Sequence, residues 1–322
     1  MPPRCLVRGS ISVSSTVKDF VLPGQTISST NLAKYTGGKG ANQAVAIARA
    51  GAIVDLVGAV GQDGFWVQDE LRAAGVGVEG ISIAEESTGR AIIQVNELGE
   101  NAIVLYKGAN YASLPVQTIH PDTTYMVFQN EIPLASTVEY LTHAASSQIS
   151  TVFNPSPMLS PEELKAFPWH QLTWLVVNAG EALELCRALN QEVQDTSKRS
   201  AEDVATPLIL QLSAYMPTTN ILCTLGADGV LANFTLPGGP KITYLPAAKL
   251  QGTTRDTTGA GDCFTGYLVA GLMRLEKKHA TIDDYVSVLR RCVQAAGMCV
   301  EKRGALASIP FAADVDARLN ST

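Results

Sequence analysis

The chain has 322 residues, of which 46% are hydrophobic, and a formal net charge of −6. This length and apolar content allow one large or two small domains with a substantial core, so disorder is not expected. The negative charge argues against binding to nucleic acid or to a membrane surface, and the longest apolar stretches are too short to span a bilayer. The N-terminus has no signal-peptide pattern. We therefore expect a cytoplasmic location, with the nucleus as an additional one.

Strand-like and helix-like segments alternate along the chain, judged by apolar periodicity and turn residues. Strands are expected at 5–7, 53–60, 91–96, 101–106, 126–129, 150–153, 174–177, 221–225 and 229–234, and helices at 41–50, 65–74, 264–275 and about 282–301, the last closing the chain. Segments 91–96 and 101–106 are expected to form a hairpin. The polar stretch 191–205 predicts an exposed loop and the start of a helix. The alternation predicts a mostly parallel sheet with helices on both faces.

Polar residues gather where the expected strands end. They lie at 37–42, 129–131, 154, 178–181, 224–229 and 256–262. In open α/β sheets, ligands bind beyond the carboxyl ends of the strands. These clusters therefore predict one binding site at that edge of the sheet.

The cysteines show no CxxC or metal-ligand spacing, and the histidines are scattered. We expect the cysteines to be small buried residues of a reducing compartment. They are Cys5, Cys186, Cys223, Cys263, Cys292 and Cys299.

The stretch 256–264, Asp-Thr-Thr-Gly-Ala-Gly-Asp-Cys-Phe, combines a glycine turn with a carboxylate just before an apolar helix. Gly259 and Gly261 allow a tight turn and a close approach to a ligand, and a helix N-terminus favours an anion. Asp262 in the same turn indicates phosphoryl transfer, with the amides holding charge and the carboxylate taking a hydroxyl proton. The alternative is an Asp that caps the helix.

A second glycine turn, Gly-Gly-Lys-Gly-Ala-Asn-Gln at 37–43, opens the first expected helix. It predicts a backbone surface for a polyol, with Lys39 and Asn42 reaching hydroxyl groups. The alternative is a linker turn with a solvated lysine. No GxxxxGK[ST] motif occurs, so a Walker-type phosphate loop is excluded.

These two motifs, in this order, resemble the two signatures of the ribokinase-like carbohydrate kinase family. The runs 127–133 and 154–157 are similar to those of the ribokinases within it, most of all the fungal ones. The resemblance extends from about residue 7 to 310. It implies an α/β fold, a three-layer α/β/α sandwich formed by a single domain over 1–322. A small β-sheet lid from about 12–35 and 90–107 is implied at the edge of the sheet, and it often pairs subunits into dimers.

The resemblance also implies roles for individual residues. The catalytic base is Asp262, with an anion hole formed by Gly259, Ala260 and Gly261. The sugar contacts are Gly38, Lys39, Asn42 and Glu131, and Ser12 and Ser14 occupy two further sugar-binding positions. The nucleotide contacts are Asn178, Glu181, Thr224, Gly226 and Gly229, of which Asn178 and Glu181 match the family's Asn-x-x-Glu that organises magnesium and phosphate. A potassium site falls on Asp256, Thr258, Cys299, Lys302, Gly304 and Ser308, partly through backbone carbonyls.

The segment after the first strand departs from the family pattern. The family has Gly-Ser-x-Asn-x-Asp there, and its Asn and Asp hold sugar hydroxyls, whereas this chain has Ser12 and Ser14. Loss of one charge-assisted hydrogen bond, about 1.5–3 kcal/mol, would weaken sugar binding roughly 10–100-fold. Trp66 is a smaller departure, at a position where the family has glycine. Either the substrate differs, or affinity is poor, or this segment is misassigned.

Four local alternatives stay open. Asn178 and Glu181 are spaced as a helix capping box, a role compatible with ligand binding. Residues 224–229 could form only a hairpin turn, and Glu131 could be a loop carboxylate. Lys302 and Arg303 could only complement a helix dipole.

The expected function is ATP-dependent phosphorylation of D-ribose at its 5-hydroxyl, with Mg²⁺ and K⁺ and with a homodimer formed through the lid. The alternatives are a kinase for another furanose or a nucleoside, and a weakly active sugar- or nucleotide-binding protein of the same fold. A nucleotide-binding dehydrogenase is disfavoured, because no GxGxxG follows the first strand.

Overall fold

The computed structural model describes residues 2–18, 21, 23–26, 28, 32–95, 101–190, 200–275 and 279–321. The strands are β1 (Arg4–Arg8), β2 (Ser12–Lys18), β3 (Leu32–Gly37), β4 (Ile53–Val60), β5 (Ile81–Ile83), β6 (Gly89–Val95), β7 (Asn101–Tyr106), β8 (Thr123–Gln129), β9 (Ser150–Asn154), β10 (Trp174–Asn178), β11 (Asn220–Thr224), β12 (Val230–Leu236) and β13 (Gly239–Leu245). The helices are α1 (Lys39–Arg49), α2 (Phe65–Ala73), α3 (Leu134–Ser146), α4 (Pro161–Ala166), α5 (Ala179–Ala188), α6 (Ala201–Tyr215), α7 (Ala260–Leu272), α8 (Ile282–Val300), α9 (Ala305–Ser308) and α10 (Ala312–Asn320). Short 3₁₀ turns lie at Gln62–Gly64, Gly108–Tyr111, Trp169–Gln171 and Gly226–Asp228.

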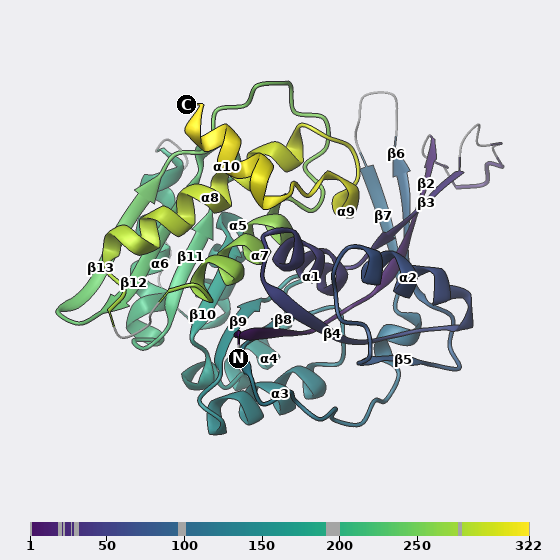
Figure 1. Ribbon diagram of the computed structural model, residues 1–322, viewed down its shortest axis with the longest axis horizontal. Coiled ribbons are helices and arrows are strands. Elements are labelled where there is room, and N and C mark those ends of the chain that lie inside the picture. Colours follow the sequence, from purple (N-terminus) through teal and green to yellow (C-terminus); the bar gives the residue numbers. More distant parts are fainter. Residues whose placement is uncertain are drawn as a thin grey trace.

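The large sheet has the strand order β13-β12-β11-β10-β9-β8-β1-β4-β5 (Figure 1). The strands from β5 to β11 run parallel, and only β12 and β13 at one edge are antiparallel. Central strands such as β1 and β8 carry apolar side chains on both faces, as strands covered on both sides must. The expected mostly parallel sheet is confirmed.

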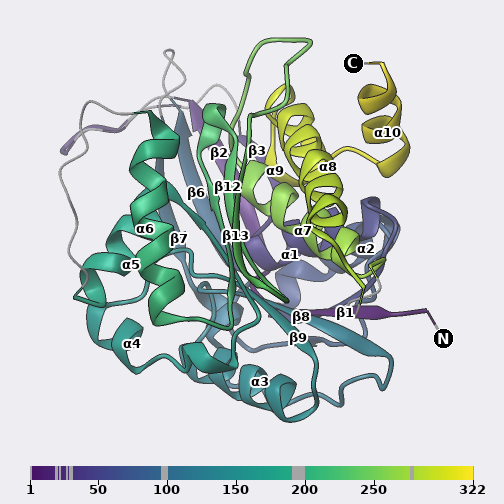
Figure 2. The same ribbon diagram turned by 90° about the vertical axis from the view of Figure 1, so that its left-hand side faces the viewer.

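Helices cover both faces of this sheet (Figure 2). One apolar core lies against α1, α2, α7 and α8, and a second lies against α3, α4, α5 and α6. The side chains of each strand alternate between the two cores: in β8, Tyr125 and Val127 belong to the first, and Met126 and Phe128 to the second. The expected three-layer α/β/α architecture is therefore confirmed.

A separate sheet with the order β3-β2-β6-β7 stands at the side of the large sheet (Figure 1). β2 pairs antiparallel with β3 and parallel with β6, and β6 pairs antiparallel with β7. The expected hairpin of β6 and β7 is present, while the residues that join them, 96–100, lie outside the described part of the chain. β2 leads directly from β1, so the small sheet begins at the carboxyl edge of the large one.

The C-terminal end and one edge strand differ from the sequence-based expectation. The helix at 282–301 does not close the chain, because α9 and α10 follow α8. β13 was not expected, since exposed polar residues such as Lys241 interrupt its apolar pattern. The first part of the polar stretch 191–205 lies outside the described residues, and α6 begins at Ala201 as expected.

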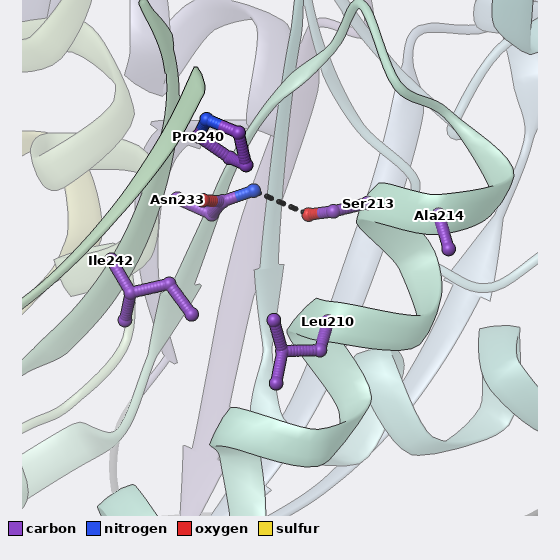
Figure 3. Close-up of a pocket in the computed structure, with 6 residues that line it drawn as sticks. All are labelled: Leu210, Ser213, Ala214, Asn233, Pro240 and Ile242. Atoms are coloured by element: carbon purple, nitrogen blue, oxygen red, sulfur yellow. Dashed lines mark hydrogen bonds between the residues drawn. The ribbon is translucent and has the colours of Figure 1, made fainter. Parts of the chain in front are cut away.

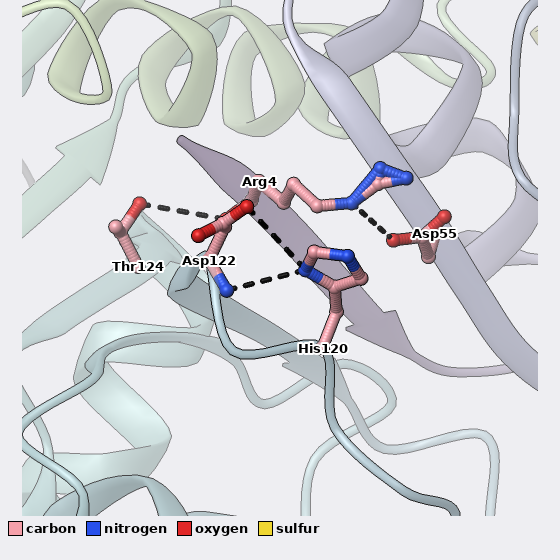
Figure 4. Close-up of polar contacts among 5 residues, drawn as sticks. All are labelled: Arg4, Asp55, His120, Asp122 and Thr124. Atoms are coloured by element: carbon pink, nitrogen blue, oxygen red, sulfur yellow. Dashed lines mark hydrogen bonds and ion pairs between the residues drawn. The ribbon is translucent and has the colours of Figure 1, made fainter. Parts of the chain in front are cut away.

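A polar cluster ties strands together at the opposite, amino edge of the sheet (Figure 4). Arg4 Nε donates to Asp55 Oδ2 at 3.2 Å, and the Asp122 N–H donates to His120 Nδ1 at 3.2 Å. Burial raises the pKa of Asp55, and the nearby Arg4 charge only partly offsets this. The cluster lies far from the polar strand ends and has a structural role.

The cysteines of the chain are all buried with free thiols, as expected. Among the residues described, none of the helices is long and apolar enough to cross a membrane.

Candidate active site

Glycines bring the first turns of α1 and α7 together at the carboxyl edge of the large sheet. A Cβ on Gly40 would lie 2.5 Å from the backbone N of Ser10, so only glycine lets α1 approach the end of β1 this closely. A Cβ on Gly266 of α7 would lie 2.3 Å from Cβ of Ala46, so the two helices also pack closely further along. The polar residues of the two first turns therefore face each other.

Asp262 points from the first turn of α7 towards α1. It is buried, with 6% of its surface exposed. Its Oδ2 accepts a hydrogen bond from Asn42 Nδ2 and its Oδ1 one from Gln43 Nε2, both at 2.9 Å. The alternative that Asp262 caps its own helix is wrong, because the N-cap is Gly259 and the helix has no side-chain cap. Two amide donors instead fix the orientation of the carboxylate towards α1.

The start of α7 combines a glycine in the left-handed region with a glycine that faces open space. Gly259 has a φ of 81°, and a Cβ there would lie 2.9 Å from Cα of Ala305. At Gly261, by contrast, no described atom lies within 4 Å of a Cβ position, leaving aside the helix's own backbone and its chain neighbours. The first N–H groups of a helix lack intrahelical acceptors, although the Ala260 N–H donates to Thr257 O at 3.3 Å. The start of α7 is thus suited to an anion in the space beside Gly261.

That space belongs to a cleft of about 210 Å³. Residues from the first turns of α1, α5 and α7 and from the strand ends line it: Lys39, Asn154, Ser156, Val176, Val177, Asn178, Glu181, Thr224, Thr257, Gly259, Gly261, Asp262 and Thr265. A larger hollow of about 320 Å³ lies between α6 and the strands β12 and β13, where Leu210, Pro240 and Ile242 form apolar walls (Figure 3). Because none of the residues lining this second hollow is ionisable, we place the candidate active site in the first cleft.

Lys39 is the cation of the cleft. Burial alone would lower its pKa, but the negative charges of Asp262, Glu131 and Glu181 outweigh burial and raise it. Lys39 therefore keeps its positive charge in the cleft that it lines.

Glu131 is held at the start of α1. Its Oε2 accepts from Ser10 Oγ at 2.5 Å and from the Lys39 N–H at 3.0 Å. Ser10 Oγ in turn accepts from the Gly40 N–H at 3.3 Å. Beside them, Gly38 has a φ of 92°, which only glycine adopts readily. The expected sugar contacts on α1 and Glu131 therefore lie at the start of α1, although among them only Lys39 lines the cleft. One oxygen of Glu131 already fixes this turn.

Ser12 and Ser14 lie on one face of β2, because they are two residues apart. Ser12 Oγ accepts from Asn110 Nδ2 at 3.1 Å, and Asn110 Oδ1 accepts from the Ile11 N–H at 2.8 Å. Ser14 Oγ packs over Gly37, where a Cβ would lie 2.6 Å from it. Neither serine is among the residues that line the cleft.

Asn178 and Glu181 form a closed capping box at the start of α5. Asn178 Oδ1 accepts from the Glu181 N–H and Glu181 Oε2 from the Asn178 N–H, both at 2.9 Å. The capping alternative is confirmed, and both residues still line the cleft. Capping fixes their side chains and leaves one oxygen of Glu181 outside the box.

The expected nucleotide contacts at 224–229 form the connection of a hairpin. Thr224 ends β11 and lines the cleft, whereas Gly226 and Gly229 do not. The Leu225 N–H donates to Gly229 O at 2.8 Å, and β12 follows antiparallel. A Cβ on Gly229 would lie 2.1 Å from Leu245 O, so this glycine is needed for packing against β13.

Asp256 joins the loop after α8 to the turn before α7. Its Oδ1 accepts from the Thr258 N–H and its Oδ2 from the Gly304 N–H, both at 2.9 Å. Cys299 Sγ and Ser308 Oγ, which flank the same loop, are 2.8 Å apart. The expected cation-site residues therefore surround one loop behind the Gly259 turn. Its carboxylate and backbone oxygens are the donor type that an alkali cation takes.

The remaining members of this loop show how it is closed. The Lys302 N–H donates to Cys299 O at 3.1 Å, just beyond the last turn of α8. A hydrogen bond with the Cys263 thiol lowers the pKa of Cys299, while burial raises the pKa of Cys263. Arg49 at the end of α1 donates to Leu306 O at 2.9 Å and to Ile309 O at 2.7 Å, which ties the loop to α1 as well.

Several residues of the site were not expected from the sequence. They are Ser10, Arg49, Asn110, Thr257 and Thr265. Thr257 lies inside the 256–264 motif and Thr265 follows it directly, so their position in the sequence could have indicated a role at the site. Asn110 and Arg49 offer none, because their partners are distant in the sequence.

Comparison with known proteins agrees with this arrangement. The family model described as pfkB family carbohydrate kinase matches residues 5–312. A ribokinase of Staphylococcus aureus (strain COL) is 30% identical over 328 residues, which cover 98% of this chain and 99% of that protein. A ribokinase of Schizosaccharomyces pombe is 30% identical over 332 residues, covering 98% and 97%. The crystal structure of a ribokinase from Cryptococcus neoformans var. grubii serotype A in complex with ADP has a TM-score of 0.87 and 47% identity, covering 98% of this chain and 99% of that one.

The family model spans nearly the whole chain, including both glycine turns and all of the cleft residues. The shared fold and the near-complete coverage of ribokinase relatives point the same way. The chain belongs to the pfkB family of carbohydrate kinases and is an enzyme, a phosphotransferase with an alcohol group as acceptor.

Proposed function

We propose that this protein catalyses the ATP-dependent phosphorylation of D-ribose at its 5-hydroxyl, giving ribose 5-phosphate and ADP. The observation that carries the proposal is the buried Asp262, which two amides hold at the mouth of an anion-binding helix N-terminus, in a cleft shared with Lys39. A ribokinase relative is covered over nearly its whole length, and the Cryptococcus structure contains ADP.

Asp262 is the general base in this proposal. It takes the proton of the sugar hydroxyl while the oxygen attacks the γ-phosphorus in line and the bond to the ADP oxygen breaks. The start of α7, from Gly259 to Gly261, holds the charge on the transferred phosphoryl group. Lys39 adds a positive charge on the α1 side of the cleft. The sugar lies against α1 and Glu131, so its hydroxyl and the phosphate meet beside Asp262.

The residues of the cleft suit a magnesium nucleotide. The carboxylate of Glu181 and the oxygen-rich strand ends provide the hard ligands that Mg²⁺ prefers, directly or through water. When bound with ATP, Mg²⁺ neutralises charge on the phosphates. Asn178 and Glu181 would hold it there, while Thr224, Gly226 and Gly229 would form the nucleotide side of the cleft.

A potassium site in the loop of Asp256 completes the proposal. This loop contacts Gly259 from behind through Ala305. A cation bound by Asp256 and by carbonyls near Thr258, Lys302 and Gly304 would hold the anion hole in place without touching the substrate.

The acceptor sugar is the open part of the proposal. Ser12 and Ser14 stand where the family has Asn and Asp, and the Ser12 hydroxyl already accepts a hydrogen bond from Asn110. This favours a second candidate, a kinase for another furanose or a nucleoside, and it would also suit a weakly active binding protein. ADP formation with MgATP and a panel of ribose, other pentoses, fructose and nucleosides separates these alternatives. A clear preference for another acceptor would reject ribose, and no turnover with any acceptor would reject the kinase proposal.

We also propose that the small sheet acts as a lid and pairs two copies of the chain, which is otherwise one domain. Tyr35 of β3 pairs with Ser14 of β2, Ser14 pairs with Ala91 of β6, and Ala91 pairs with Leu105 of β7, so all four side chains lie on the same face of the small sheet. On this face Tyr35 is 51% exposed and Leu105 is 56% exposed. Exposed apolar side chains on one face of a sheet favour a partner. Light scattering of the parent and of Leu105→Lys tests it, since a monomeric parent rejects the dimer. A closest relation to fungal ribokinases and a cytoplasmic location stay predictions.

A further inference from the structure

A buried chain of side-chain amides leads from the large sheet to Asp262. Gln129 at the end of β8 donates through Nε2 to Gln43 Oε1 at 2.6 Å. Gln43 of α1 donates through Nε2 to Asp262 Oδ1 at 2.9 Å. Both glutamines are fully buried. Three elements that are distant in the sequence thus meet in one hydrogen-bonded line.

The donors and acceptors in this chain of amides are consistent in only one orientation. An ionised carboxylate can only accept hydrogen bonds, so Gln43 must turn its NH₂ group towards Asp262. Its carbonyl oxygen then faces Gln129, which supplies a donor. Asn42 holds the other oxygen of Asp262 in the same way. An amide in the opposite orientation would set Gln43 Oε1 against the carboxylate oxygen.

We propose that Gln43, backed by Gln129, is a positioning residue that holds the Asp262 carboxylate in the orientation in which it faces the cleft. The proposal rests on the function assigned above to Asp262 as the base. Hydrogen bonds to the charged form of a carboxylate favour that form, and a fixed base needs no reorientation when the hydroxyl arrives. Gln43 does not line the cleft, so its effect on catalysis passes through Asp262.

The ionisable groups that feel the charge of Asp262 come from three helices. They are Lys39 of α1, Cys263 of α7 and Cys299 of α8, whose pKa values the charge of Asp262 raises in each case. Glu131 and Glu181 in turn act on Lys39. A substitution at Gln43 removes none of these groups, so a change in the pH dependence reports the amide contact itself.

The test compares Gln43→Met and Gln129→Met with the parent enzyme. Methionine keeps the length of glutamine but donates no hydrogen bond. The matched control is Gln294→Met, because Gln294 is also a buried glutamine, in α8, and its Nε2 has no partner among the described residues. The rate kcat and KM are measured with D-ribose and MgATP from about pH 5 to 9, and thermal unfolding is followed in parallel.

We expect Gln43→Met to shift the acidic limb of the pH profile of kcat to higher pH by roughly one unit, since Asp262 then loses one charge-assisted hydrogen bond. At neutral pH, kcat should fall about tenfold and KM for ribose less than about threefold, because the contact acts on the base and not on the sugar. Gln129→Met should shift the limb in the same direction by less, since Gln43 stays but is no longer held. Gln294→Met should leave both kcat and the limb unchanged.

A folded Gln43→Met with the acidic limb and kcat of the parent overturns the proposal. Where Gln43→Met does not fold, the Gln129→Met profile decides in the same way. If Asp262 were not the general base, Asp262→Asn would keep its turnover, so a failure of the proposed function is distinguished from a failure of the role of Gln43. A readout without catalysis is the side-chain amide NMR signal of Gln43, identified by its loss in Gln43→Met. Its chemical shift should change in Asp262→Asn, because the amide then faces a neutral group, and a signal identical in the parent and in Asp262→Asn would also overturn the proposal.

Discussion

Replacing Asp262 by Asn separates the chemical role of this carboxylate from its role in the fold. Each of its oxygens accepts one amide hydrogen bond, from Asn42 and from Gln43. An asparagine of the same shape can accept only one of them, and its own NH₂ group faces the other donor. A buried donor without a partner costs about 1–3 kcal/mol, which lowers the melting temperature by a few degrees. Loss of the base should also lower turnover by roughly 10²–10⁴-fold.

The double variant Asp262→Asn with Gln43→Glu distinguishes the two effects. The carboxylate introduced at position 43 accepts from the new amide at position 262 and also accepts from Gln129, so every hydrogen bond regains a partner. Stability should recover relative to the single variant, whereas turnover should not. Calorimetry measures the first and a coupled assay for ADP the second.

Two outcomes would refute this reasoning. If purified Asp262→Asn kept more than about a tenth of the parent turnover, a general base could not be its role. If the double variant were no more stable than the single one, the amide donors would not be oriented as described.

The cation loop, the altered sugar segment and the anion hole each allow a further test. Turnover in buffer free of sodium and potassium should rise when KCl is added at constant ionic strength. Asp256→Asn should abolish this rise, because Asp256 holds both sides of the loop. If KCl leaves the turnover of the parent unchanged, the cation site is rejected. Ser14→Asp should lower KM for ribose by up to roughly 10–100-fold with little change in kcat, since one charged hydrogen bond is gained in ground and transition states alike. Adding Ser12→Asn should cost stability, because Asn110 already packs against Ser12 and donates a hydrogen bond to it. An unchanged or higher KM for Ser14→Asp would mean that Ser14 does not face the sugar. Gly261→Ala should keep its stability but lose turnover, because its Cβ would occupy the open space of the anion hole; full activity in this variant would place the phosphate elsewhere.

The sequence by itself determined the fold class and the location of the site. Apolar strands spaced by helices can be satisfied only by a parallel sheet covered on both faces, and β4 has the bounds expected from its run of β-branched residues. The glycine turns at 37–40 and 259–261 were informative because a close backbone approach restricts the residue type locally. The capping box of Asn178 and Glu181 was readable for the same reason, since its partners lie three residues apart.

Only the tertiary structure decided which side chains meet. Gln43 lies 219 residues from Asp262 and 86 from Gln129, and nothing in its local pattern distinguishes it from a solvated glutamine. Whether Asp262 caps its helix or faces α1 was equally undecided, because both are compatible with the same turn sequence. The periodicity of a segment reports which face is buried but not which partner covers it. Contacts between distant segments depend on how helices and strands pack, and at this site packing set the orientation of the Asp262 carboxylate.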